Sequence, residues 1–209
     1  MTKGFMAIFI VMMALLVSMG CLFPASPPAA PPAPTPEPST MPTPESPIST
    51  IQPSAMALQL SDIPSDYILK DRSDAVYTEQ NPISQGLGWE GGYSVTFYRI
   101  NLEKYDLTGL RQTINVYPIR NMNKVFDMAQ EDMESGANGT TAVYEIPLPR
   151  IGDQSIAYKT QDSADPNRPG VYSIIFVKKD VFEKLEMGGT TTDYETLKQI
   201  ANTAAGKIR

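Results

Sequence analysis

In residues 91–133, "GGYSVTFYRINLEKYDLTGLRQTINVYPIRNMNKVFDMAQEDM", the hydrophobic pattern changes its period part of the way along. Residues 91–105 are rich in β-forming side chains, and residues 111–119 alternate apolar with polar positions, so both predict strands. From Met122 onward the apolar residues recur at intervals of three and four, which predicts one face of a helix. These helical positions are Met122, Val125, Phe126, Ala129 and Met133. The stretch therefore predicts two strands followed by an amphipathic helix.

The same two periods organise the sequence on either side. Residues 60–73 predict an irregular or helical lead-in and a proline turn, with a strand at residues 67–70. A closing helix is predicted at residues 193–207, where Thr192 and Glu195 have the spacing of a capping box. Further strands are predicted at residues 142–146, 155–161, 171–179 and 181–187.

Strands, helix, strands, helix is an order that predicts an α+β fold. Runs of consecutive strands favour an antiparallel sheet, and we expect the two main helices to pack on one side of it. The motif Tyr-Ser-x-x-Phe occurs twice, at residues 93–97 and 172–176, each time followed by further strand and then a helix. A duplicated unit is one interpretation, and convergence of two buried strands on similar residues is the one we favour.

Composition excludes several kinds of chemistry. The chain has 209 residues, a formal net charge of −6 and no cluster of Lys and Arg, so nucleic acid is not an expected partner. It contains no histidine and a single cysteine, Cys21. Serine or cysteine nucleophiles activated by histidine are therefore absent, as are zinc sites built on imidazole or thiolate. We expect no cofactor and no metal site.

The N-terminal residues predict export. Lys3 precedes an apolar run, residues 5–17, of the length expected for the core of a signal peptide, so residues 1–20 are predicted to be one. Counted to residue 23, the apolar stretch is also long enough to span a bilayer, which leaves an uncleaved signal anchor as the alternative. Either way, the remainder of the chain is predicted to lie on the extracellular side of the cell membrane.

Cys21 is the predicted attachment point. Gly20 and Cys21 after an apolar run resemble the lipobox of bacterial and archaeal lipoproteins, although Ser18 and Met19 depart from its usual Leu and small residue. That resemblance implies cleavage before Cys21 and a lipid on its sulfur. In the signal-anchor alternative, Cys21 is an ordinary apolar residue.

Residues 21–55 are predicted to be a disordered, proline-rich linker. Twelve of the 19 prolines fall between Pro24 and Pro53, and proline withholds the amide donor that a helix or sheet requires. Some thirty residues of polyproline II could hold a domain about 90 Å from its anchor. Residues 56–209, of ordinary globular composition, are the predicted domain.

Two positions in the domain are candidates for ligand or glycan. Trp89 lies in a glycine-rich turn with Tyr93 nearby, so the pair is a candidate aromatic platform for a sugar or peptide, or else Trp89 covers the edge of the sheet. Asn138 begins the N-glycosylation sequon Asn-Gly-Thr in an exported chain. Gly86, Gly88 and Gly91 match G-x-G-x-x-G, but this precedes a strand, so we interpret it as a turn.

Acidic residues form the remaining candidates. Asp127, Glu131, Asp132 and Glu134 lie on the predicted helix, where a solvated face explains them better than a metal site, and Asp162 and Asp165 share a loop. Met122, Met128 and Met133 are better explained by helix packing than by copper. No catalytic residues are predicted.

The order of elements resembles the Mog1/PsbP-like fold, and the whole chain resembles surface lipoproteins of methanogenic archaea. These resemblances imply a fold and a location. Together with the predicted tether, they favour an extracytoplasmic module that binds a ligand, a glycan or another envelope protein. The alternative function is a surface hydrolase, or another enzyme, that uses carboxylates alone.

Overall fold

The computed structural model describes residues 51–209 other than Asn138 and Pro166. The predicted signal peptide or anchor, Cys21 and residues 21–50 of the predicted linker lie outside the described residues. The helices are α1 (Pro53–Met56), α2 (Pro82–Gly86), α3 (Met122–Ser135) and α4 (Tyr194–Lys207). The strands are β1 (Tyr67–Asp74), β2 (Gly91–Asn101), β3 (Asp106–Val116), β4 (Thr141–Glu145), β5 (Gln154–Asp162), β6 (Val171–Lys178) and β7 (Val181–Gly189).

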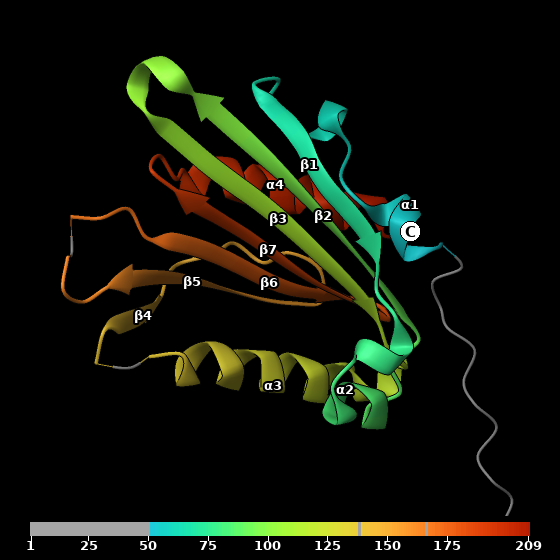
Figure 1. Cartoon of the computed structure of the whole chain (residues 1–209). Helices are drawn as coiled ribbons and strands as arrows, with labels where there is room; N and C mark the ends of the chain where they lie inside the picture. The colour runs from blue at the N-terminus through green and yellow to red at the C-terminus, as the bar shows by residue number, and fades with distance from the viewer. Residues whose placement is uncertain (1–50, 138, 166) are drawn as a thin grey trace, which may run out of the picture. The chain divides into compact units, whose positions relative to one another are not determined.

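All seven strands form one antiparallel sheet in the order β1-β2-β3-β7-β6-β5-β4 (Figure 1). Strands β1 to β3 make one meander and strands β4 to β7 make another, because each strand pairs with its neighbour in the chain. Short turns join β2 to β3 and β6 to β7, whereas the connection from β1 to β2 contains α2. Helix α3 connects the two meanders, so that β3 and β7 meet in the middle of the sheet. The predicted α+β fold with an antiparallel sheet and two main helices is confirmed.

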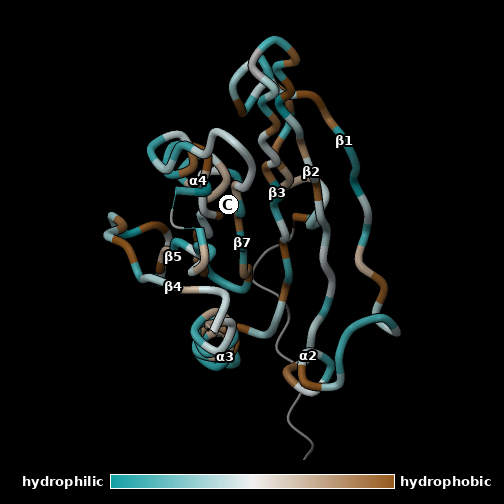
Figure 2. Tube along the Cα trace, turned by 60° about the vertical axis from the view of Figure 1, so that its left-hand side comes forward, coloured by the Kyte–Doolittle hydropathy of each residue, from teal (hydrophilic) through white to brown (hydrophobic). Residues whose placement is uncertain are grey.

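Helices α3 and α4 pack on opposite faces of the sheet, which corrects the expectation that both lie on one side. Strand β6 is apolar on both faces: Ile174 and Phe176 pack in the cluster that contains α4, and Ile175 and Val177 pack in the cluster that contains α3. Figures 1 and 2 show α4 and α3 on either side of the part of the sheet that includes β5. A strand that is buried on both faces loses the alternation of apolar and polar residues. The continuous apolar run of β6 was therefore the feature of the sequence that indicated a helix on each face.

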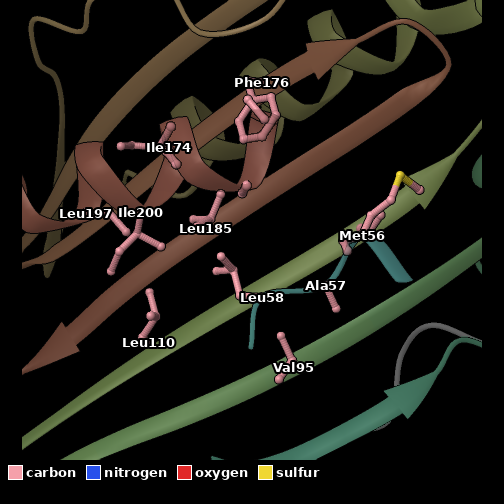
Figure 3. Close-up of a cluster of buried hydrophobic side chains, with 14 of the residues drawn as sticks. Met56, Ala57, Leu58, Val95, Leu110, Ile174, Phe176, Leu185, Leu197 and Ile200 are labelled. Atoms are coloured by element: carbon pink, nitrogen blue, oxygen red, sulfur yellow. The ribbon is translucent and has the colours of Figure 1, made fainter. Parts of the chain in front are cut away.

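The larger core lies between the sheet and α4. Leu110, Ile114 and Leu185, at the centre of the sheet, are 0% exposed, and Leu197 of α4 is equally buried. Residues Met56 to Leu58 complete this core over the meander of β1 to β3 (Figure 3). The start of the described chain therefore serves as part of the core.

The smaller core lies on the opposite face, beneath α3. Met122 and Val125 of α3 pack there against Ile175, Val177 and Phe182, together with Leu87, Trp89 and Tyr117. The glycine-rich turn before β2 enters this core: Gly88 adopts a φ of 76°, a left-handed conformation that favours glycine. Gly88 thus lies in a turn as predicted, whereas Gly86 ends α2 and Gly91 begins β2.

Helix α4 begins one residue later than the predicted capping box. Asp193 is the N-cap residue, and its carboxylate accepts hydrogen bonds from the Glu195 N–H at 3.0 Å and from the Thr196 hydroxyl at 2.6 Å. Aspartate is a strong N-cap because its oxygens satisfy the free N–H groups of the first turn. The predicted N-cap, Thr192, is therefore wrong by one residue.

The two Tyr-Ser-x-x-Phe motifs lie in β2 and β6, and their tyrosines and phenylalanines face the α4 core. A duplicated strand-strand-helix unit in an antiparallel sheet would place its two helices on the same face. Helices α3 and α4 lie on opposite faces. Convergence of two buried strands remains the better explanation of the motif.

A candidate ligand pocket beside the first strand

A pocket of about 280 Å³ opens on the α4 face of the sheet, between β1, β2 and the chain that runs through α1 into residue 60. Val95 and Phe97 of β2 form its floor, and both are almost fully buried. Ala57, Leu58 and Leu60 form one wall, and Leu69 and Arg72 of β1 form the other. The pocket therefore has an apolar floor, while polar and apolar atoms contribute about equally to its exposed surface, with a cation on one side.

The wall formed by residues 57–60 is fixed to the sheet and to α4. The Leu58 N–H donates to the side-chain oxygen of Gln112 at 2.8 Å, and the Gln59 N–H donates to Asp62 at 2.7 Å. Asp62 in turn forms an ion pair with Lys207, at the end of α4, at 2.6 Å. These contacts hold the segment away from β1, so the space between them stays open.

A β-bulge gives the second wall its composition. Leu69 pairs with Phe97 and Arg72 pairs with Val95, and the register shifts between Leu69 and Asp71. Without the extra residue, positions 69 and 72 would point to opposite faces, since side chains alternate along a strand. The bulge turns Arg72 to the same face as Leu69, and bulges often direct a side chain in this way beside functional sites.

Polar groups occupy one part of the lining. Arg72 supplies the only positive charge among the residues that line the pocket, and Tyr93 and Ser54 supply hydroxyl groups. Within the described part of the chain, no carboxylate lies within 4.0 Å of the Arg72 guanidinium. The nearest acidic residue on the same strand face is Asp74, which pairs with Tyr93.

The structure separates the two aromatic residues of the predicted platform. Tyr93 is half-buried and lines the pocket. Trp89 is only 6% exposed, packs in the core beneath α3, and donates its indole N–H to Asn115 at 2.7 Å. Asn115 pairs with Gly92, whose Cβ position faces Trp89, so Trp89 and Tyr93 lie on opposite faces of β2.

The other predicted site residues do not assemble. Asn138, like Cys21, lies outside the described residues. The side chains of Asp127, Glu131, Asp132 and Glu134 are exposed on α3. In the described part of the chain, no three His, Cys, Asp or Glu residues are placed to share a metal ion.

One buried carboxylate lies near the pocket without lining it. Glu183 of β7 is 0% exposed, and burial raises its pKa to about 7, although the hydrogen bond from Gln112 and the charge of Lys207 partly oppose the shift. Glu183 Oε2 accepts the Gln112 side-chain N–H at 2.8 Å, whereas Oε1 has no partner among the described residues. Gln112 thus links this carboxylate to Leu58 in the pocket wall.

Sequence reasoning missed Arg72, Gln112 and Glu183. Arg72 lies beyond the strand predicted at residues 67–70, whereas β1 continues to Asp74, and only the bulge decides which way Arg72 faces. Gln112 and Glu183 occupy inward positions of strands β3 and β7. A polar residue at an inward position was the one available signal for them.

The fold is similar to that of the extracellular domain of PknH from Mycobacterium tuberculosis, with a TM-score of 0.55 and 12% sequence identity. The match covers 74% of this chain and 93% of that chain. A scan against models of protein families and a search of curated protein sequences both find no match. None of the helices among the described residues is long and apolar enough to cross a membrane.

Proposed function

We propose that this protein is a membrane-tethered, extracytoplasmic module that binds a small ligand in the pocket between β1, β2 and residues 54–60. The observation that carries the proposal is the pocket itself, which combines an apolar floor with an unpaired cation turned inward by a bulge. Sites for small molecules are typically concave, mostly apolar and provided with a few directed polar groups. The similar fold of the extracellular domain of PknH is in line with such a module.

The tether is the N-terminal part of the proposal. Residues 1–20 direct export, Cys21 carries a lipid, and residues 21–55 space the domain from the extracellular side of the membrane. The competing form is a signal anchor that stays uncleaved through residue 23. The resemblance to surface lipoproteins of methanogenic archaea supports the lipid, and the Mog1/PsbP-like comparison stays a prediction.

Mass spectrometry of the membrane-extracted protein tests the tether. A lipoprotein would begin at Cys21 and carry the mass of its lipid, and Cys21→Ser would abolish both the processing and the added mass. An intact Met1 without lipid on Cys21 would show the signal anchor instead. The same spectra test glycosylation, because Asn138→Gln removes the glycan mass if the sequon is used.

Binding is tested by asking what the pocket holds. Ser54 lines the pocket and is exposed, so Ser54→Trp should fill it without disturbing the core. Ala55, its exposed neighbour, does not line the pocket, so Ala55→Trp is the matched control. Native mass spectrometry should find a small molecule on the wild-type chain and on Ala55→Trp, and none on Ser54→Trp. Equal occupancy in all three would place the ligand elsewhere.

The competing functions have less support. A hydrolase that uses carboxylates needs acidic groups in its cleft, and the residues that line this pocket include none. A glycan or another envelope protein as partner would require an exposed recognition surface. The β2 and β3 turn exposes Leu102 and Tyr105, but nothing near it indicates a partner.

A further inference from the structure

We infer that the pocket binds an amphipathic monoanion, a carboxylate carrying a hydrocarbon chain or ring, with its head on Arg72 and its tail along the floor of the pocket. This inference rests on the function proposed above and goes further by naming the class of ligand. Four features of the pocket carry it: the direction of Arg72, its lack of a partner, the number of charges and the size of the apolar part.

The orientation of the Arg72 side chain depends on an interruption of the pairing between β1 and β2. The bulge between Leu69 and Asp71 leaves one residue of β1 without a partner in the ladder. The bulge residue, Lys70, places its ammonium 5.3 Å from the Tyr98 ring. Tyr98 pairs with Gly109 and so faces away from the pocket, on the side opposite Phe97. Lys70 and Arg72 thus lie on opposite faces of the sheet, and Arg72 lies on the face that carries the pocket.

Arg72 is available to an anion from solution. It is exposed, and within the described part of the chain its guanidinium has no ion pair or hydrogen bond. A guanidinium presents a planar pair of donors that matches a carboxylate, and it loses less hydration than an ammonium when it binds. Tyr93, on the same face of the sheet, offers a hydroxyl as a further donor to the head group.

The charge balance selects a single negative charge. Arg72 is the only cationic residue in the lining, and Asp74 lies two positions further along the same strand. A second charge on the ligand would therefore meet no cation and would be repelled by Asp74. This disfavours a dianionic phosphate and favours a carboxylate.

The apolar part of the pocket selects a hydrocarbon tail. Leu58, Leu60, Leu69, Val95 and Phe97 all contribute to the lining, and Leu69 is still 42% exposed. An inorganic anion would leave the exposed side chains of Leu60 and Leu69 in water, whereas a hydrocarbon tail lying on the buried floor would cover them. The pocket, at about 280 Å³, is roughly twice the cavity that binds benzene in an engineered protein, so the ligand has about a dozen non-hydrogen atoms.

The test compares two water-soluble probes of equal size, 3-phenylpropionate and its neutral isostere 3-phenylpropanamide, on the full chain in non-ionic detergent by isothermal titration. The wild type should bind the carboxylate at least about threefold more tightly than the amide, because an ion pair with an exposed guanidinium is weakened by solvent but still favourable. Arg72→Gln should remove that preference and leave the affinity for the amide unchanged. Octanoate, as a second arm, distinguishes alkyl from aryl tails, and acetate reports the head group alone.

Arg111→Gln is the matched control, because Arg111 is exposed on the next strand but one and faces away from the pocket. It should change neither affinity. Thermal unfolding of both variants should match the wild type, since both residues are exposed. Equal binding of amide and carboxylate would overturn the anion while leaving the proposed binding function in place. The inference of an anionic ligand would also be overturned if the wild type did not bind the carboxylate, or if Arg72→Gln and Arg111→Gln lost the same amount of affinity for it. The Ser54→Trp experiment tests separately whether the pocket binds any ligand.

Discussion

Gln112 and Glu183, both fully buried, are joined by a 2.8 Å hydrogen bond across strands β3 and β7. The Gln112 amide donates to the Glu183 carboxylate, and its oxygen accepts the Leu58 N–H from the pocket wall at 2.8 Å. Buried polar groups cost free energy unless they are paired, so these three groups fix one another's positions. The core of the sheet is thereby connected to the segment that forms the ligand pocket.

Glu183→Gln should remove a pH dependence of stability. The pKa of Glu183 is about 7 in the folded chain and 4.5 in a model peptide, so the folded state holds this proton over a range in which the unfolded state has lost it. Stability from this group is therefore lost as the pH rises from 4.5 to 7, by about 3 kcal/mol at most. Urea unfolding followed by Trp89 fluorescence measures the free energy of unfolding. Between pH 5 and pH 8, this free energy should fall by about 2 kcal/mol more in the wild type than in the variant.

Glu186→Gln is the control for that measurement, because Glu186 lies on the same strand, is partly exposed and pairs with Lys184 at 2.9 Å. It should leave the pH dependence as it is in the wild type. If the free energy of unfolding changed with pH equally in the wild type and in Glu183→Gln, Glu183 would have to be ionised in the folded state throughout this range.

Gln112→Leu should destabilise the fold by roughly 2 to 4 kcal/mol. The change keeps the volume of the side chain but leaves the Leu58 N–H and the Glu183 carboxylate buried without their partner. The double variant with Glu183→Leu should recover part of that loss, because it also removes the buried carboxyl group that has lost its partner. Chemical denaturation of the single and double variants measures both effects, and a double variant less stable than the single one would contradict the explanation.

Asp193→Ala should destabilise the chain by about 1 kcal/mol, the usual cost of removing an N-cap. Thr192→Ala, the position that the sequence favoured, should cost less than about 0.5 kcal/mol. The hydrogen bond from Thr196 lowers the pKa of Asp193, so its stabilising effect is present above pH 3.8 and declines as the pH falls below that value. Thermal unfolding at pH 7 and at pH 3 should therefore show the difference between the two variants shrinking in acid.

Trp89→Phe should destabilise the fold by about 1 to 2 kcal/mol and leave binding of 3-phenylpropionate unchanged. The indole hydrogen bond to Asn115 is lost, and Trp89 lies on the opposite face of β2 from the pocket. Tyr93→Phe should weaken binding a few-fold with little effect on stability, because Tyr93 lines the pocket. Circular dichroism measures the effect on stability, and titration measures the effect on binding. A loss of affinity in Trp89→Phe would support the predicted aromatic platform of Trp89 and Tyr93 after all.

Much of the fold could be predicted, because the elements of regular structure follow from local periodicity. The helix that begins at Met122, the strands around Val95 and Ile114, and the closing helix all appear where the apolar spacing placed them. The faces on which α3 and α4 pack could not be predicted in the same way. They depend on β6 being apolar on both sides, and a short apolar run allows several arrangements.

The candidate site was predictable only in part. Tyr93 was identified from its place near a turn, and it lines the pocket, whereas Trp89 was identified for the same reason and lies in the opposite core. Arg72 was not identified at all, because its orientation depends on a bulge whose existence is decided by pairing with β2. Register is a property of two strands together, and the sequence of one strand does not determine it.

The sequence by itself determined the α+β class, the order of the elements, and the exclusion of chemistry that needs histidine or paired cysteines. These follow from composition and from the period of apolar residues, which act over a few residues at a time. Only the tertiary structure decided that Leu58, Arg72 and Tyr93 surround one pocket, and that Gln112 ties its wall to a buried carboxylate. Those residues are far apart in the chain, and long-range strand pairing and burial bring them together.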